Sequence, residues 1–115
     1  MLGFLAARKK QWPAAVRALK KANHLMPHTP EILRCLGYAI VRDGKRLQGI
    51  VTLERALNLD PENTQILCTL GTVYLRMRSR HKAQRLFARA LAIDPQCEPA
   101  QQGMILARRV RKANA

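Results

Sequence analysis

The side chains best suited to metal binding or acid–base chemistry, the three histidines of this 115-residue chain, are not spaced for either role. His24, His28 and His81 have no cysteine or carboxylate partner at a recognisable metal-ligand spacing. Pro27 also interrupts any helix that would place His24 and His28 on one face. We therefore expect surface or helix-end histidines and no metal site.

The three cysteines, Cys35, Cys68 and Cys97, are odd in number and scattered along the sequence, which is typical of reduced thiols in a cytosolic protein. No histidine lies at a neighbouring equivalent position to activate Cys68, so we expect a small apolar packing residue there rather than a nucleophile. The chain also lacks a glycine-rich phosphate loop, an H-E-x-x-H motif and a paired-carboxylate motif. The sequence predicts a cytoplasmic protein that is not an enzyme and has no cofactor.

Proline and the dipeptide Leu-Gly each recur three times at one fixed interval. The prolines are Pro27, Pro61 and Pro95, and the Leu-Gly pairs begin at Leu2, Leu36 and Leu70. Self-similarity at a fixed period of about 20–50 residues indicates a repeat array, and the period here is about 34 residues. We expect the function of such an array to lie on its surface rather than in a catalytic pocket.

Within each period the apolar residues have the spacing of a helix with one buried face. Leu33, Leu36, Gly37 and Ile40 stand at i, i+3, i+4 and i+7, and the residues one period later repeat this spacing. A glycine inside a helix costs about 1 kcal/mol relative to alanine, so its recurrence indicates that a neighbouring helix approaches closely. The pattern predicts seven helices, near 2–10, 13–25, 30–43, 46–58, 64–77, 80–92 and 98–112.

Capping residues begin the predicted helices and prolines follow their ends. Thr29 and Pro30 have the types preferred at the N-cap and the first helical position, and Asn63 or Thr64 can cap a later helix. Proline cannot continue a helix that precedes it, so each repeat ends at its proline.

The third copy of the repeat carries the full pattern, namely Leu67, Leu70, Gly71, Tyr74, Ala83, Phe87, Ala90 and Pro95. This pattern and its period resemble the tetratricopeptide repeat family. The second copy departs from the family only at Gly49, where alanine is usual. The resemblance implies an all-α fold, specifically an α-solenoid of about three stacked helix-turn-helix repeats with a C-terminal capping helix.

The repeat pattern also predicts that the chain forms one domain, residues 1–115. Its repeats would span about 1–27, which is N-terminally incomplete, then 30–61 and 64–95, followed by a capping helix at 98–112. In that helix Gln101, Ile105 and Arg108 replace the residues that the repeat expects. Ala100, Met104 and Ala107 would pack inward while Gln101 and Arg108 face solvent.

The chain is strongly basic, because 21 lysines and arginines against seven acidic residues leave a formal charge of +14. A charge of this size predicts attraction to acidic peptides, nucleic acid or anionic surfaces. The alternative is that the basic residues only form solvated faces. No apolar run approaches the roughly 20 residues that span a membrane, so we expect no membrane span.

Arginine also recurs at the repeat interval, at Arg8, Arg42 and Arg76. Each of these arginines lies near the C-terminal end of the first of the two helices predicted for its repeat. The family resemblance implies that this side of the first helices lines a concave groove. The candidate ligand-binding residues of the groove are Phe4, Arg8, Arg34, Tyr38, Val41, Arg42, Cys68, Thr72, Leu75 and Arg76. An alternative explanation of the arginines is that each complements the negative end of a helix dipole.

These features predict a protein–protein interaction module, either an adaptor, a scaffold subunit or a small chaperone. It would hold a protein or peptide partner, an acidic segment in our hypothesis, in the groove. The alternative function is binding of nucleic acid or another polyanion on the basic surface, for which the five aromatic residues offer few stacking positions. Exposed repeat ends, with Leu2 and Phe4 at the N-terminal edge, would also allow a homodimer.

Overall fold

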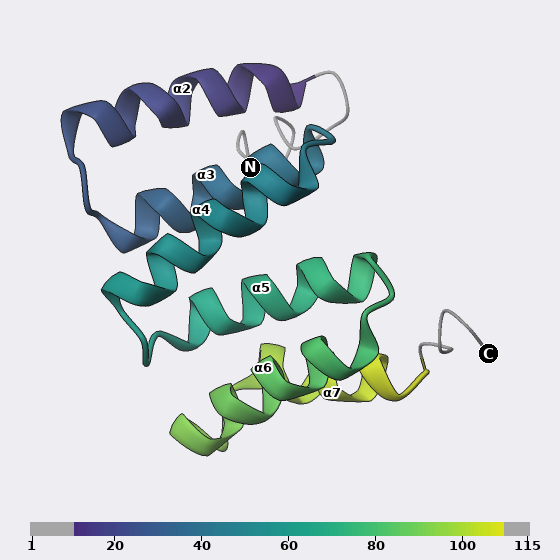
Figure 1. Cartoon of the computed structure of the whole chain (residues 1–115). Helices are drawn as coiled ribbons and strands as arrows, with labels where there is room; N and C mark the ends of the chain where they lie inside the picture. Colours follow the sequence, from purple (N-terminus) through teal and green to yellow (C-terminus); the bar gives the residue numbers. More distant parts are fainter. Residues whose placement is uncertain (1–10, 110–115) are drawn as a thin grey trace. The chain divides into compact units, whose positions relative to one another are not determined.

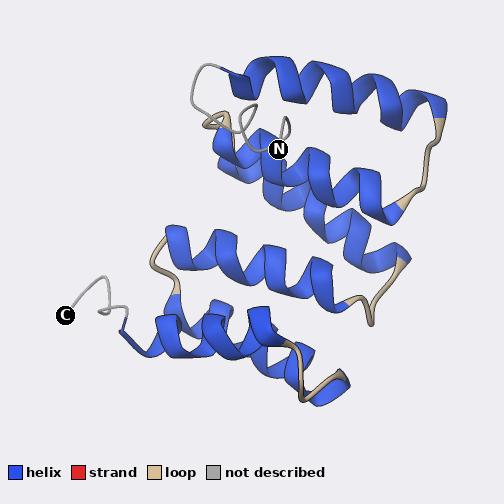
Figure 2. Cartoon of the chain, turned by 180° about the vertical axis from the view of Figure 1, so that it is seen from behind, coloured by secondary structure: helices blue, strands red, loops and turns tan. Residues whose placement is uncertain are grey.

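In the computed structural model, which describes residues 11–109, every regular element is a helix (Figures 1 and 2). The helices are α2 (Trp12–Leu25), α3 (Pro30–Arg42), α4 (Arg46–Leu59), α5 (Thr64–Arg76), α6 (Arg80–Ile93) and α7 (Glu98–Arg109). Apart from the C-terminal end of α7, their ends lie within one residue of the predicted ends, which confirms that part of the sequence prediction. The helix predicted at 2–10 and the last three residues of the helix predicted at 98–112 lie outside the described residues.

The described helices group into two compact units. The N-terminal unit ends at Asp60 and contains α2, α3 and α4. The C-terminal unit begins at Pro61 and contains α5, α6 and α7. Each unit is built from antiparallel neighbours joined by short turns, and each has its own buried residues.

In the N-terminal unit α3 is the central helix, because it packs against both α2 and α4. Trp12 and Val16 of α2 meet Leu36 and Ile40 of α3 in one buried cluster. Leu53 of α4 is fully buried. The predicted apolar face of residues 30–43 is thus the face that α3 buries.

The contact between α3 and α4 is close because glycine stands on both helices. A Cβ atom built on Gly37 would lie 2.7 Å from Cγ of Leu53. One built on Gly49 would lie 2.7 Å from the carbonyl oxygen of Gly37 and 2.9 Å from the backbone nitrogen of Val41. The departure from the repeat pattern at Gly49 therefore has a packing reason, because even a methyl group would press on the backbone of α3.

In the C-terminal unit α6 packs against both α5 and α7, and Phe87 of α6 is its central side chain. A Cβ built on Gly71 of α5 would lie 2.7 Å from Cζ of the Phe87 ring. One built on Gly103 of α7 would lie 2.7 Å from Cδ1 of the same ring. The ring therefore occupies space that two glycines, one on each neighbouring helix, leave open.

Helix α7 buries the face that the sequence predicted, with Gly103 near its centre. Its buried residues are Ala100, Gly103 and Ala107, and Met104 is only half-buried. The inward packing predicted for Ala100 and Ala107 is confirmed, and Met104 is partly buried on the same side. The central contact of Gly103 with the Phe87 ring was not predicted. Ile105 and Leu106 are 42% and 50% exposed, so the outer face of α7 is partly apolar.

The caps and turns agree with the sequence prediction at one helix and differ at another. Asn63 accepts a hydrogen bond from the backbone N–H of Ile66 at 3.1 Å, as an N-cap should. Thr29 holds the N-cap position of α3, but its hydroxyl donates to the carbonyl of Met26 instead of capping the helix. Thr29 therefore stabilises the turn before α3 rather than the helix terminus.

The two turns inside the helix pairs share one backbone conformation with different residues. Gly44, between α3 and α4, has φ +96°, and Arg78, at the equivalent position between α5 and α6, has φ +60°. Glycine adopts this left-handed region freely, whereas arginine does so at a steric cost.

Candidate binding surface

A cluster of polar and aromatic side chains surrounds Arg42, a predicted site residue at the C-terminal end of α3 in the N-terminal unit. Nη1 of Arg42 donates a hydrogen bond to the hydroxyl of Tyr38 at 3.1 Å, four residues earlier on the same helix face. Cζ of Arg42 lies 5.0 Å from the ring centroid of Trp12 on α2 and 5.8 Å from that of Tyr38. The two rings meet edge to face, with centroids 6.0 Å apart.

This arrangement holds the Arg42 guanidinium in one orientation. Cation–π contact with tryptophan is attractive by about 0.5–1 kcal/mol at exposed sites and more when water is excluded. Trp12 is buried, and Tyr38 and Arg42 are half-buried. A guanidinium has five N–H donors, so the hydrogen bond to Tyr38 leaves donors that can bind a carboxylate.

Arg34, one turn before Tyr38, is paired within its own helix. Its Nη2 donates to Oε2 of Glu31, and its Nε donates to Oε1 of Glu31 at 3.4 Å. The hydrogen bond from Arg34 lowers the pKa of Glu31 below its ordinary value, and the bond to Glu31 raises the pKa of Arg34. A partner carboxylate would have to compete with Glu31 for this arginine.

Two predicted groove residues are packing residues instead, which corrects their assignment. Val41 is 8% exposed, and its Cγ2 lies against the position where Gly49 of α4 lacks a side chain. Cys68 on α5 is 7% exposed. Neither side chain is available to a ligand on the surface of its unit.

The remaining predicted residues of the C-terminal unit lie on α5. Thr72 is exposed, and its hydroxyl donates to the carbonyl of Cys68 at 2.9 Å. Leu75 is half-buried and Arg76 is exposed. Helix α5 therefore presents an apolar side chain beside a cation at its C-terminal end. Phe4 and Arg8, the candidates of the first repeat, lie outside the described residues.

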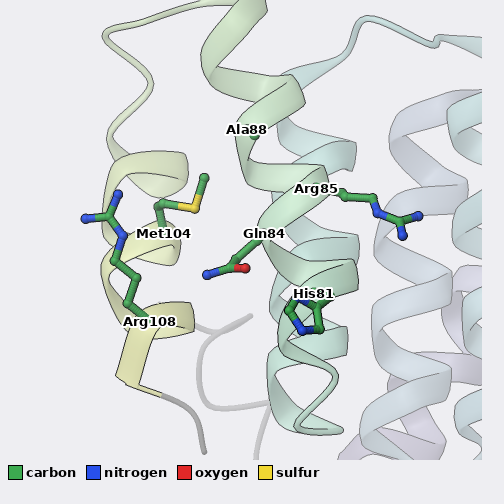
Figure 3. A pocket seen from close by; sticks show the side chains of 6 residues that line it. All are labelled: His81, Gln84, Arg85, Ala88, Met104 and Arg108. Carbon is green, nitrogen blue, oxygen red and sulfur yellow. The ribbon is translucent and has the colours of Figure 1, made fainter. Parts of the chain in front are cut away.

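A second basic surface, an open groove of about 450 Å³ between α6 and α7, has a mixed lining. Its residues are His81, Gln84, Arg85, Ala88, Met104 and Arg108. Gln84 points from α6 towards α7 and Met104 points from α7 towards α6, whereas Arg85 extends away from α7 (Figure 3). The sequence predicted that Arg108 faces solvent, but it did not bring Met104 and Gln84 together.

The cysteines are less scattered in space than in sequence. Sγ of Cys68 lies 3.8 Å from Sγ of Cys97, which directly precedes α7, and both thiols are free. Burial, together with the hydrogen bond between the two thiols, raises the pKa of Cys68 to about 12. In the N-terminal unit burial also raises the pKa of Cys35. A buried thiol of this kind is protonated at neutral pH, in keeping with the packing role predicted for Cys68.

Two features are absent from residues 11–109. No group of three or more histidine, cysteine or acidic side chains there is arranged to hold a metal ion. None of the helices in the same range is long and apolar enough to cross a bilayer.

Paired helices that recur at a fixed sequence interval define a helical-repeat protein. A sequence model of the tetratricopeptide repeat matches residues 41–108, more than half of the chain, so the chain belongs to the tetratricopeptide repeat family. The predicted family and the all-α helical-repeat fold are thereby confirmed. The chain is a protein–protein interaction module of this family.

Among solved structures, the tetratricopeptide repeat domain of Sgt2 from Aspergillus fumigatus is similar to this chain, with a TM-score of 0.79. The match covers 93% of this chain and 72% of the Sgt2 domain, at 18% sequence identity. At this identity the likeness concerns the fold. A search of curated proteins finds no match.

Proposed function

We propose that the chain binds an acidic segment of a partner protein through outward side chains of its first helices, α3 and α5. The residues of this first-helix surface are Arg34, Tyr38 and Arg42 on α3, and Thr72, Leu75 and Arg76 on α5. Phe4 and Arg8 extend the same proposal to the first repeat. The formal charge of +14 supports an acidic partner over a basic one, because opposite charge both attracts and selects it.

The observation that carries the proposal is the fixed position of Arg42. Its guanidinium is held by the hydroxyl of Tyr38 and the ring of Trp12 before any ligand arrives. Ordering a long side chain on binding costs about 0.5–1.5 kcal/mol, and this cost is already met here within the folded chain. A carboxylate that reaches Arg42 would form a charged hydrogen bond, which contributes about 1.5–3 kcal/mol.

The test uses a defined ligand, a fluorescent peptide of glutamates with interspersed leucines, and two matched double variants of the full chain. Arg42→Met with Arg76→Met removes the two arginines at the C-terminal ends of α3 and α5. Arg85→Met with Arg108→Met removes the same charge from the groove between α6 and α7. We expect the first pair to weaken binding at least about tenfold, from the contribution of charged hydrogen bonds, and the second to change it much less.

Equal losses in the two double variants would contradict the proposal, because net charge rather than the first-helix surface would then control binding. Circular dichroism of each variant shows whether it remains folded. The single variant Arg76→Met adds a control against misfolding, because Arg76 is exposed and its removal leaves the Trp12 cluster intact.

The second candidate function, polyanion binding, is supported by the basic groove between α6 and α7. The aromatic residues of the described chain argue against stacking on bases. Trp12 and Phe87 are buried, a cation lies over Tyr38, and Nζ of Lys82 lies 5.4 Å from the ring centroid of Tyr74.

Salt dependence separates the two functions. A single-stranded oligonucleotide should lose affinity with a slope of about 0.7 logarithmic units per neutralised phosphate. Tighter binding of the oligonucleotide than of the acidic peptide, lost in Arg85→Met with Arg108→Met, would favour the second function.

A further inference from the structure

Two free thiols lie close together in the C-terminal unit, outside the proposed binding surface. Cys68 lies in the second turn of α5, and Cys97 lies directly before the first residue of α7, 29 positions later in the sequence. Their sulfur atoms are 3.8 Å apart. A disulfide requires about 2.05 Å, so a movement of less than about 2 Å closes the bond.

The two thiols differ in access to solvent. Cys68 is buried at 7% exposure, whereas Cys97 is half-buried at the edge of the unit. The carbonyl of Cys97 accepts the first hydrogen bond of α7, from the backbone N–H of Gln101 at 3.0 Å, so its backbone is fixed at the helix start. An oxidant in solution therefore meets Cys97 first, with Cys68 in contact behind it.

We propose that Cys68 and Cys97 form a modification site, at which a peroxide converts the two thiols into an intramolecular disulfide. This inference rests on the packing of the C-terminal unit alone and does not depend on the proposed binding function.

The reaction takes place in two steps. In the first, the sulfur of Cys97 attacks a peroxide oxygen, the O–O bond breaks, and the products are a sulfenic acid on Cys97 and one water. In the second, the sulfur of Cys68 attacks the sulfur of that sulfenic acid, and the hydroxyl group leaves with the Cys68 proton as a second water. Two thiols and one hydrogen peroxide thus give one disulfide and two waters, with the peroxide reduced.

The new bond would join α5 to the start of α7. These elements otherwise touch through side chains packed around Phe87, with Gly103 of α7 against the ring. The cross-link closes a loop that contains all of α6, which restricts the unfolded chain and keeps the start of α7 on α5. Oxidation should therefore raise the thermal midpoint of the chain and slow amide hydrogen exchange in the first turn of α7.

The two cysteines that form the disulfide can be identified because trypsin places the three cysteines in separate peptides. Cys35 falls in residues 35–42, Cys68 in 56–76 and Cys97 in 90–108. The full chain is treated with one equivalent of hydrogen peroxide, alkylated and digested without reductant. We expect a linked species of peptides 56–76 and 90–108 that has lost two hydrogen atoms, while peptide 35–42 is recovered alkylated.

The matched variants are Cys35→Ser, which should keep the linked species, and Cys68→Ser, which should lose it and leave Cys97 as a sulfenic acid open to trapping by dimedone. The folded geometry should also accelerate the reaction. We expect the disulfide to form at least about tenfold faster in native buffer than in urea, because the folded chain holds the two sulfurs together.

Three outcomes would overturn the proposal, two in the wild-type chain and one in a variant. One is a linked species that contains peptide 35–42 in place of peptide 56–76 or 90–108. The other is oxidation of Cys97 to the sulfinic acid in the folded wild-type chain with Cys68 still free. Because Cys35→Ser retains both proposed partners, its failure to form the bond while remaining folded would have the same meaning.

Discussion

The helix pairs α3–α4 and α5–α6 occupy equivalent positions in successive repeats, yet they are held together by different contacts. In α3–α4 the two helices meet backbone to backbone at Gly37 and Gly49, with Leu53 beside them. In α5–α6 the equivalent positions are Gly71, Ala83 and Phe87, and the aromatic ring fills the space. The repeat period therefore determines which positions of the two helices meet. The residues at those positions determine how closely the helices approach.

The same contrast holds for the arginine that ends each first helix. Arg42 is held between Trp12 and Tyr38, whereas Arg76 is exposed. One repeat further along the chain, the counterpart of Trp12 is Arg46 and the counterpart of Tyr38 is Thr72. Two arginines in the same frame therefore have different surroundings, and only one of them is oriented by its neighbours.

The largest effect should come from removing the central side chain of α5–α6. Phe87→Ala should lower the free energy of unfolding by about 3–5 kcal/mol, because it leaves a cavity between Gly71 and Gly103. Leu53→Ala, the equivalent change in α3–α4, should cost about 2–5 kcal/mol. Urea unfolding followed by circular dichroism measures both. Leu106→Ala, a truncation at an exposed position, serves as the control and should stay within about 0.5 kcal/mol of wild type.

Gly49→Ala should destabilise the chain although alanine is both the better helix former and the usual residue of the family. Helix propensity favours the change by about 1 kcal/mol. Overpacking against the Gly37 carbonyl and the Val41 backbone opposes it by about 1–3 kcal/mol. The denaturation midpoint should fall, while that of Gln48→Ala, at the exposed neighbouring position, should not. A rise in the Gly49→Ala denaturation midpoint would mean that the contact between α3 and α4 leaves room for a methyl group.

Substitutions at the equivalent turn residues Gly44 and Arg78 should change the stability of the chain in opposite directions. Gly44→Arg places a side chain at φ +96° and should cost about 1–2 kcal/mol. Arg78→Gly relieves the same strain and should gain up to about 1 kcal/mol, less than the full strain because glycine also loosens the unfolded chain. The thermal midpoint of each variant, compared with that of the wild type, shows whether the substitution stabilises or destabilises the chain. A lower midpoint for Arg78→Gly would show that the Arg78 side chain makes a stabilising contact.

The smallest expected effect is a difference in stability between the Arg42 and Arg76 variants, measured without ligand. Arg42→Met should cost about 0.5–1 kcal/mol through the lost cation–π contact and should change the fluorescence of Trp12, the single tryptophan. Arg76→Met should stay within about 0.5 kcal/mol of wild type and leave the fluorescence unchanged. Identical behaviour of the two variants would contradict the difference in their surroundings.

The sequence predicted the helices well because their ends depend on local signals. The spacing of Leu33, Leu36 and Ile40 sets the buried face of α3, and prolines follow the ends of the repeats. The sequence also placed Ala100 and Ala107 on the buried face of α7. It missed the close contact of Gly103, because that contact depends on the Phe87 ring of another helix.

The binding surface was predictable only in part, for a related reason. Periodicity placed Arg42 and Tyr38 on one face of a helix, but Val41 was misassigned because its burial depends on the missing side chain of Gly49. The orientation of Arg42 needed a contact from Trp12 on another helix. The sequence did contain a signal for this contact. Trp12 stands at a repeat position that holds arginine in the two later copies, Arg46 and Arg80.

The most direct test of the account is to locate the bound acidic peptide on the chain. Amide chemical shifts of the isotope-labelled full chain, followed by nuclear magnetic resonance during titration with the glutamate–leucine peptide, report the contact residue by residue. We expect the largest changes in the last turns of α3 and α5, around Tyr38, Arg42 and Arg76. Largest changes around Gln84, Met104 and Arg108, with α3 and α5 unaffected, would contradict this expectation.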